Sequence, residues 1–463
     1  MAPTNMEPIS PSKSGMLMWL KTARRWLMPA GSRRERWARS IYVPIMEKRF
    51  ERRLLLQLGD AEFRRRYAKA PPRNSRAPAP TPKLVWLSGN LMDVPPAGPR
   101  PAPVERVVVI KLDHLGDFVL GARALCQLRE GFPDAHITLV CGTWNAPWAE
   151  RLGIFNRIVS HNFFAPLNRD VYSSKVKWQN RYCDIAEKLN DHYDLAVDFR
   201  YDEDTRPILY RIDATYRAGF LAPIEPGLPY LDLVVPCPQS VLDGDLKTRS
   251  LHAELRLELL AAAVVAAFGA RRPHPMRLCF PQPAVVTRSY AVLSIGAGGP
   301  IRYWPIERYA EVGRALVERR DLDIVILGGE AERECAERLA SLLPENRVRV
   351  VIGQPVAELP ELIGAASLCI GNGTGITHLA AALDVPTVAV LAGVDRMEVW
   401  RPAGTNAVAI GGLTPCQPCG LREKDECPWG VVCLNAVTSV MVLEACGLLL
   451  ARSGPVAPVS ESV

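Results

Sequence analysis

Three turns in the C-terminal half of the chain combine glycines with polar residues in a pattern that suits a nucleoside diphosphate. They are GAGGPIRYWP from Gly296, GGE from Gly328 and GNGTGITH from Gly371. Glycine lets a backbone approach a ligand closely, and a helix start offers free N–H groups and the positive end of a dipole. Arg302 adds a fixed positive charge, and Glu330 can accept hydrogen bonds from a ribose diol. We therefore predict a nucleotide site, although the GxGxxG fingerprint of dinucleotide-binding domains is missing.

A fourth turn, KLDHLGDFVL from Lys111, carries an acid that could act as a general base. Gly116 permits a tight turn, and Asp117 would stand in the first turn of the helix that follows. A carboxylate at that place can take a proton from a hydroxyl group. Aspartate is also a residue that helix starts prefer, so capping is the alternative to catalysis.

Short β-branched runs precede all four turns and alternate with amphipathic helical patterns. The predicted strands are Arg106–Ile110, Ile137–Val140 and Asp194–Phe199 in a first series, then Ala291–Ile295, Asp323–Gly328, Val348–Ile352, Leu368–Ile370 and Thr387–Leu391 in a second. Because the carboxyl ends of parallel strands meet at one edge of a sheet, each series gathers its turns there. We predict an α/β protein of two doubly wound Rossmann-like domains facing a cleft, with a boundary near Cys279–Ser289.

Composition divides the 463 residues into five segments. Residues 1–70 are predicted to be a basic amphipathic helical extension, and residues 71–103, which contain ten prolines, a linker. The N-terminal Rossmann-like domain would span residues 104–285 and the C-terminal one residues 286–450. Residues 451–463 would form a flexible tail.

The excess positive charge lies in the extension, because residues 1–70 hold 16 of the 56 Lys and Arg residues but 6 of the 49 Asp and Glu residues. The near-neutral remainder argues against nucleic-acid binding. Over residues 16–70, arginines alternate with an apolar set made up of Trp19, Trp26, Trp37, Leu54 and Leu58. Such helices could bind an anionic membrane surface, or they could pack on the protein or a partner.

The sequence gives no sign of a membrane span or of a secretory signal, since the first apolar stretch, Met16–Leu20, is only about five residues long. Its longest apolar run, LLAAAVVAAFGA from Leu259, is about a dozen residues, whereas about 20 are needed to cross a bilayer. Twelve cysteines spread over a chain of this length suit a reduced compartment. We predict a cytoplasmic protein, held peripherally at the inner face of the cytoplasmic membrane if the basic helices bind lipid.

Four stretches together resemble the bacterial heptosyltransferase family, glycosyltransferase family 9. They are VVVIKLDHLGDFVLGARALCQLREGFPDAHITLV from Val107, GAGGPIRYWPIERYAEV from Gly296, LGGEAERE from Leu327 and CIGNGTGITHLAAALDVPTVAVL from Cys369. The resemblance implies a GT-B fold with an N-terminal acceptor domain and a C-terminal nucleotide-sugar domain. It also implies inverting transfer of heptose or a related sugar from an ADP-linked donor to the lipopolysaccharide core or another cell-envelope saccharide. No cofactor or catalytic metal is implied.

The resemblance assigns roles to individual residues. Asp117 matches the family's general base, and Arg302 stands where the family usually has a lysine that neutralises the leaving diphosphate. Glu330 matches the acid that binds the ribose. The other predicted nucleotide-sugar residues are Gly298, Gly373, Thr374, Gly375, Thr377 and His378, the last of which orients the turn.

Gly373 departs from the family pattern, which commonly has an acid before the Ser/Thr-Gly pair that contacts the donor sugar. This glycine leaves the identity of the sugar open. Together with the long extension it favours an alternative function, a non-catalytic scaffold or sensor that binds nucleotide sugars in an envelope-assembly complex. An NAD-dependent enzyme is a third reading, against which the missing GxGxxG pattern counts.

Two further clusters could hold a metal. Asp202, Glu203 and Asp204 resemble the DxD motif of the other large glycosyltransferase class, or they form an acidic solvated loop. The second cluster consists of Cys416, Cys419, Cys427 and Cys433. It could form a structural zinc site, two disulfides on exposure to oxidant, or a loop of packed free thiols.

Overall fold

The computed structural model describes residues 103–164, 185–220 except 186 and 202, 231–235, 251–269 and 289–453, together with the short strand β1 (Lys83–Leu84). The predicted extension of residues 1–70 lies outside this part of the chain. So do most of the predicted linker, the predicted domain boundary up to residue 288 and residues 454–463. Both sheets of the protein belong to one compact unit of the chain.

Seven parallel strands form the N-terminal sheet in the order β1-β7-β6-β5-β2-β3-β4. Besides β1 they are β2 (Arg106–Lys111), β3 (His136–Cys141), β4 (Arg157–Ser160), β5 (Tyr193–Asp198), β6 (Ala214–Phe220) and β7 (Leu233–Val235). Every residue of β2 from Val107 onward is buried. A sheet covered on both faces accounts for this continuous β-branched run.

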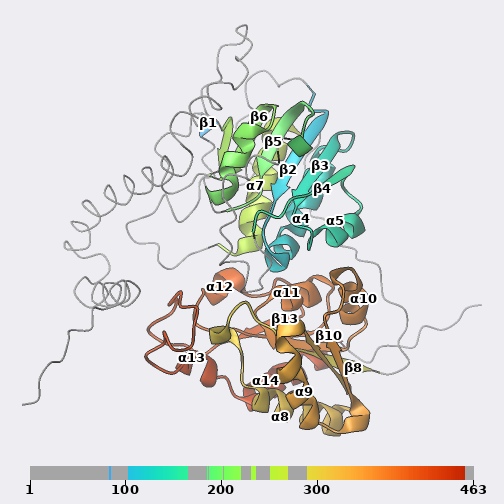
Figure 1. Ribbon diagram of the computed structural model, residues 1–463, viewed down its shortest axis with the longest axis vertical. Coiled ribbons are helices and arrows are strands. Elements are labelled where there is room, and N and C mark those ends of the chain that lie inside the picture. The colour runs from blue at the N-terminus through green and yellow to red at the C-terminus, as the bar shows by residue number, and fades with distance from the viewer. Residues whose placement is uncertain are drawn as a thin grey trace, which may run out of the picture. The chain divides into compact units, whose positions relative to one another are not determined.

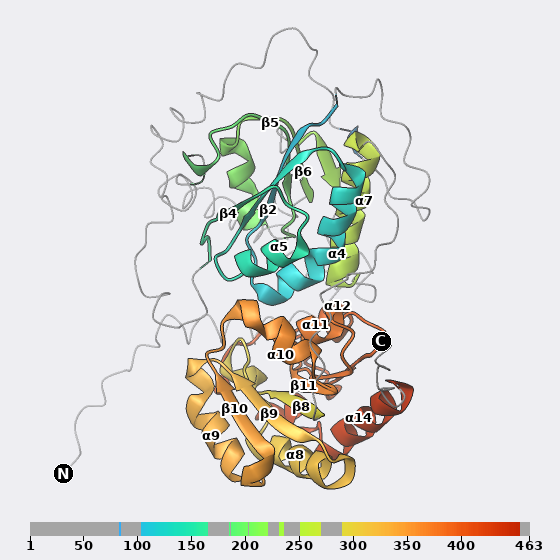
Figure 2. The ribbon, with the colours of Figure 1, turned by 90° about the vertical axis from the view of Figure 1, so that its right-hand side faces the viewer.

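Helices α4 (Leu115–Gly131) and α7 (Ala253–Phe268) pack side by side on one face of this sheet (Figures 1 and 2). Val107 and Val109 of β2 belong to the core beneath them. Val108 and Ile110 belong to a second core cluster, which includes residues of the 3-10 helix η2 (Glu203–Arg211). A further helix, α5 (Ala146–Leu152), lies between β3 and β4 in the chain.

Six parallel strands form the C-terminal sheet in the order β10-β9-β8-β11-β12-β13. They are β8 (Tyr290–Ser294), β9 (Asp323–Gly328), β10 (Val348–Ile352), β11 (Leu368–Asn372), β12 (Thr387–Val390) and β13 (Ala407–Ile410). The helices are α8 (Ile306–Arg320), α9 (Arg333–Ser341), α10 (Leu359–Gly364), α11 (Gly375–Ala382), α12 (Met397–Trp400), α13 (Val432–Asn435) and α14 (Ser439–Ser453). Single 3-10 turns occur at η3 (Pro300–Arg302), η4 (Glu330–Glu332), η5 (Glu345–Arg347) and η6 (Val356–Glu358).

The direction of winding reverses in the middle of each sheet. In the N-terminal sheet the reversal falls between β2 and β5, and in the C-terminal sheet between β8 and β11. Doubly wound proteins bind ligands beyond the carboxyl ends of strands at such a point. The predicted architecture of two doubly wound Rossmann-like domains is confirmed. None of the described helices has the length and hydropathy needed to cross a membrane.

Candidate active site

Asp117 stands in the first turn of α4, directly after the carboxyl end of β2. Its side chain is half-buried, whereas Phe118 and the residues after it turn into the core. The acid therefore lies at the switch point of the N-terminal sheet. This is the position that a base acting on a bound hydroxyl would need.

The turn between β11 and α11 is fixed by its own polar side chains. The Oγ1 atom of Thr377 lies 2.9 Å from the carbonyl oxygen of Thr374 and accepts the Thr374 N–H at 3.2 Å. Asn372, fully buried at the end of β11, donates to the carbonyl of Ile295 at 2.9 Å and accepts the Trp304 N–H at 3.1 Å. Asn372 thus joins this turn to the turn after β8, a role that the sequence did not reveal.

Two buried polar atoms beside this turn have no hydrogen-bond partner among the described residues, Thr374 Oγ1 and His378 Nδ1. Burial, with a smaller contribution from His252, lowers the pKa of His378 to about 4. The imidazole is therefore neutral at physiological pH and can offer a hydrogen bond without a charge. Unpaired buried polar atoms are rare in proteins, and at a helix start they suit an incoming ligand.

The starts of α4 and α11 lie against each other. A Cβ atom on Gly116 would come within 3.2 Å of His378 Cδ2 and 3.3 Å of Gly375 Cα. A Cβ atom on Gly375 would lie 3.1 Å from the backbone nitrogen of Gly116. A side chain at either position would require the facing helix start to shift by a few tenths of an ångström. The structure thereby brings the predicted base, Asp117, next to the predicted phosphate turn that begins at Thr374.

Arg302 forms an ion pair that the sequence did not indicate. It ends η3, after β8, and its guanidinium lies 2.5 Å from Asp395 Oδ2 in the loop after β12. Both side chains are little more than one-third exposed, so ligands can reach them. The predicted diphosphate-binding cation therefore stands beside a carboxylate.

Gly373 packs against an apolar side chain. A Cβ atom placed on this residue would lie 2.2 Å from Cδ2 of Leu391, the residue that follows β12. The acid that the family pattern has at this position would displace Leu391. Gly298, by contrast, faces open space, since a Cβ atom there would meet nothing within 4 Å.

Glu330 lies at the carboxyl end of β9, on the far side of β8 from β11. Its side chain is 68% exposed and pairs with Arg333 at 2.8 Å. The neighbouring Glu332 has a structural role instead, because it is buried and accepts hydrogen bonds from the Gly329 N–H and the Tyr303 hydroxyl. Glu330 is thus the accessible acid of this turn.

A buried charge cluster of Lys111, Asp113 and Arg200 lies at the carboxyl ends of β2 and β5. Its first two members shortly precede Asp117 in the sequence. Asp113 pairs with Lys111 at 2.7 Å and with Arg200, and it is 4% exposed. Burial acts to raise the pKa of Asp113, but the charges of Lys111 and Arg200 together outweigh it, so the pKa is lowered. Arg200 also lies 4.5 Å from the centre of the Phe164 ring. The cluster fixes the backbone from which α4 starts.

The cysteine-rich loop supports the loop that holds Asp395. The thiols of Cys427 and Cys433 accept backbone N–H groups at 3.3 Å, from Val431 and Gly393 respectively. All four cysteines are free thiols, and among the described residues no three His, Cys, Asp or Glu side chains are placed to hold a metal. Of the Asp202–Asp204 triplet, Asp202 and the side chains of the other two acids lie outside the described residues.

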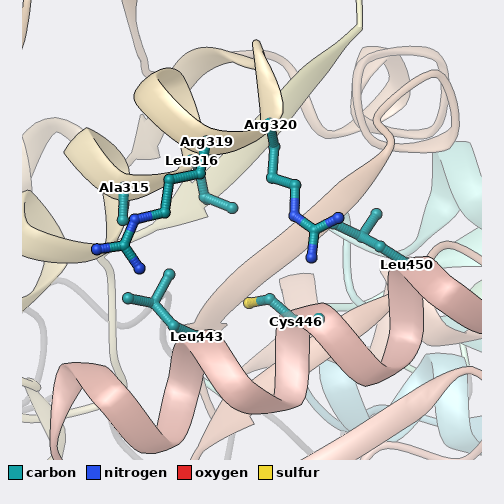
Figure 3. A pocket seen from close by; sticks show the side chains of 8 residues that line it. Ala315, Leu316, Arg319, Arg320, Leu443, Cys446 and Leu450 are labelled. Carbon is teal, nitrogen blue, oxygen red and sulfur yellow. The ribbon is translucent and has the colours of Figure 1, made fainter.

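A cavity of about 100 Å³ lies elsewhere, between α8 and α14 (Figure 3). Arg319 and Arg320 border it from α8, and Leu443, Cys446 and Leu450 border it from α14. None of the predicted site residues lines this cavity.

Comparison with known proteins shows which family the chain resembles. Residues 243–429 match the family model of glycosyltransferase family 9 (heptosyltransferase). The chain is 21% identical over 337 residues to lipooligosaccharide heptosyltransferase 2 of Haemophilus ducreyi, an alignment that covers 66% of this chain and 90% of that protein.

Two solved structures share the fold. The glycosyl transferase family 9 protein of Veillonella parvula superposes with a TM-score of 0.59 at 19% identity, covering 76% of this chain and 99% of that one. The ADP-heptose lipopolysaccharide heptosyltransferase II of Escherichia coli superposes with a TM-score of 0.53 at 21% identity, covering 75% and 99%. With two Rossmann-like domains of the GT-B type and these sequence matches, the chain is a glycosyltransferase that resembles glycosyltransferase family 9, the heptosyltransferase family.

Proposed function

We propose that this glycosyltransferase moves heptose or a related sugar from an ADP-linked donor to a lipopolysaccharide-core or other cell-envelope saccharide, with inversion at the anomeric carbon. The observation that carries the proposal is the contact between the starts of α4 and α11 at Gly116 and Gly375. It places a half-buried acid beside a helix start suited to a diphosphate. The names of the relatives in Haemophilus ducreyi and Escherichia coli supply the sugar, the nucleotide and the acceptor class.

The reaction would be a single displacement. Asp117 takes the proton of the acceptor hydroxyl, whose oxygen attacks the anomeric carbon while the bond to the β-phosphate breaks. The negative charge that develops on the leaving ADP meets the N-terminus of α11 and the guanidinium of Arg302. Attack from the face opposite to the leaving group inverts the configuration.

The remaining predicted residues would hold the nucleotide. Thr374 Oγ1 and His378 Nδ1, both buried and unpaired among the described residues, can hydrogen-bond the phosphates. Glycines at positions 298 and 375 allow close approach of the backbone, and the exposed Glu330 can accept the ribose hydroxyls. Thr377 keeps the turn in shape through its contacts with Thr374.

The proposal is tested by product analysis with the purified full chain. ADP-heptose and a core-truncated lipopolysaccharide are the substrates. We expect release of ADP, a gain of one heptose in the mass of the acceptor, and inverted anomeric configuration by NMR. Nucleotide binding without turnover across a panel of sugar donors would instead support the scaffold or sensor function.

We also propose that the basic residues 16–70 hold the enzyme near an anionic membrane surface. The support is the charge and aromatic pattern of the sequence, since these residues lie outside the described part of the chain. The full chain should co-sediment with phosphatidylglycerol vesicles and not with phosphatidylcholine vesicles. Equal behaviour with both lipids would remove the membrane role.

A further inference from the structure

The pair formed by Arg302 and Asp395 joins two loops that flank the β11 turn. Arg302 follows β8 and Asp395 follows β12, and β11 lies between these two strands in the sheet. The three strands are parallel, so their carboxyl ends share one edge. The ion pair at 2.5 Å therefore links the two loops on either side of the turn from Gly373 to Gly375, at the carboxyl edge of the sheet.

Asp395 is the one acid in the three loops at this edge. The loops after β8, β11 and β12 comprise residues 295–304, 372–375 and 391–396, and their sequences contain no other Asp or Glu. Gly373 carries no side chain, and Leu391 Cδ2 fills the point where its Cβ atom would stand. Within these three loops, a carboxylate that contacts a ligand would come from Asp395.

The backbone that carries Asp395 is held in place from behind. The Cys419 N–H donates to the Gly393 carbonyl at 3.1 Å, and the Gly420 N–H donates to the Val394 carbonyl at 3.0 Å. The Gly393 N–H in turn donates to Cys433 Sγ at 3.3 Å. The cysteine-rich loop thus orients the Asp395 loop, while the carboxylate itself is 38% exposed. A side chain whose backbone is held in this way is suited to recognising a ligand.

We propose that Asp395 is a specificity-determining residue that distinguishes the intact nucleotide sugar from the free nucleoside diphosphate, an inference that rests on the proposed function. The donor's diphosphate takes over Arg302, and Asp395 then faces the sugar attached to that diphosphate and accepts hydrogen bonds from its hydroxyls. A free diphosphate gains no such bond, and the extra negative charge on its unesterified terminal phosphate lies near the Asp395 carboxylate. The carboxylate therefore favours donor binding and promotes release of the nucleotide product.

The experiment measures the dissociation constants of ADP and ADP-heptose by calorimetry, for the wild type and Asp395→Asn. The variant keeps the side-chain volume but removes the charge. We expect ADP to bind equally or more tightly and ADP-heptose to bind more weakly, so that the ratio of the two constants changes at least about tenfold. Glu398→Gln is the matched control, because this acid pairs with Arg396 in the same segment and is 55% exposed; its ratio should not change.

Each other result has a distinct meaning. A wild type that binds both compounds, with an unchanged ratio in Asp395→Asn, would overturn the role of Asp395 and leave the proposed function standing. A wild type that binds neither compound would overturn both. Asp395→Ser is measured in parallel, so that a folding defect in one variant does not decide the outcome.

Discussion

Gly116 and Gly375 hold the starts of α4 and α11 together, since a Cβ atom on Gly116 would lie 3.3 Å from Gly375 Cα. One residue belongs to the N-terminal sheet's first turn and the other to the turn after β11. Their approach sets the distance between Asp117 and the phosphate turn. We therefore expect these two glycines, as well as the polar residues beside them, to affect the reaction.

Gly116→Ala is expected to lower kcat/KM about tenfold, because a methyl group between the helix starts would shift the base relative to the donor. ADP binding should change little, since the phosphate turn itself is intact. Steady-state kinetics and calorimetry check both expectations. Gly447→Ala in α14 is the matched control, because the nearest atom to its added Cβ would be 3.7 Å away. Equal kinetics of the two variants would show that the contact is unimportant.

Asp113→Asn is expected to reduce the free energy of unfolding by about 3–5 kcal/mol, because it leaves the charge of Lys111 buried without its partner. Lys111 is 2% exposed, so water cannot replace the carboxylate. Urea denaturation measures the loss. Asp191→Asn serves as the control, since its ion pairs with Arg106 and Arg157 are about two-fifths exposed and should contribute less than about 1 kcal/mol. Similar losses in both variants would contradict the buried-pair argument.

His378 is expected to make the protein less stable as the pH falls from about 6.5 towards 4. Burial lowers the pKa of His378 to about 4, so in this range the unfolded chain binds a proton that the folded chain does not. The contribution of the neutral imidazole to the free energy of unfolding is fully present above the unfolded-state pKa of about 6.5. As the pH falls from there to the folded-state pKa, about 3 kcal/mol of this contribution is lost. Denaturation at a series of pH values should show a shallower slope for His378→Gln than for the wild type. Parallel slopes would mean that His378 is not the group responsible.

Much of the fold could be predicted from the sequence, because its signals are local. The β-branched runs at Arg106–Ile110 and Ala291–Ile295 became the central strands β2 and β8, and the glycine turns follow carboxyl strand ends as expected. Strands β1, β4, β6, β7 and β13 were not predicted. They are short or contain polar residues, and their pairing with neighbours stabilises them.

The pairings within the site could not be predicted, because they join residues far apart in the chain. Arg200 reaches Asp113 because β5 lies next to β2 in the sheet. Arg302 reaches Asp395 because β8 and β12 lie on either side of β11. Asn372 belongs to the glycine turn GNGTGITH, and its buried amide joins two loops. Strand order, which sequence patterns do not specify, decides these contacts.

Removal of metal ions with EDTA is expected to leave turnover unchanged, because the α11 N-terminus and Arg302 would supply the positive charge for the leaving diphosphate. Arg302→Gln, by contrast, should lower kcat by about a hundredfold. Both are followed as ADP release. Loss of activity in EDTA that returns on adding Mg²⁺ or Mn²⁺ would contradict the expectation and reopen the metal hypotheses.

Replacement of the proposed base provides the most direct measurement: ADP release from ADP-heptose in the presence of a lipopolysaccharide-core acceptor, compared for the wild type and Asp117→Asn. We expect kcat to fall by about 10²–10⁴ while ADP binds with unchanged affinity. Asp134→Asn, an exposed acid just beyond the other end of α4, should behave as the wild type. Full turnover by Asp117→Asn would show that this carboxylate is not the base.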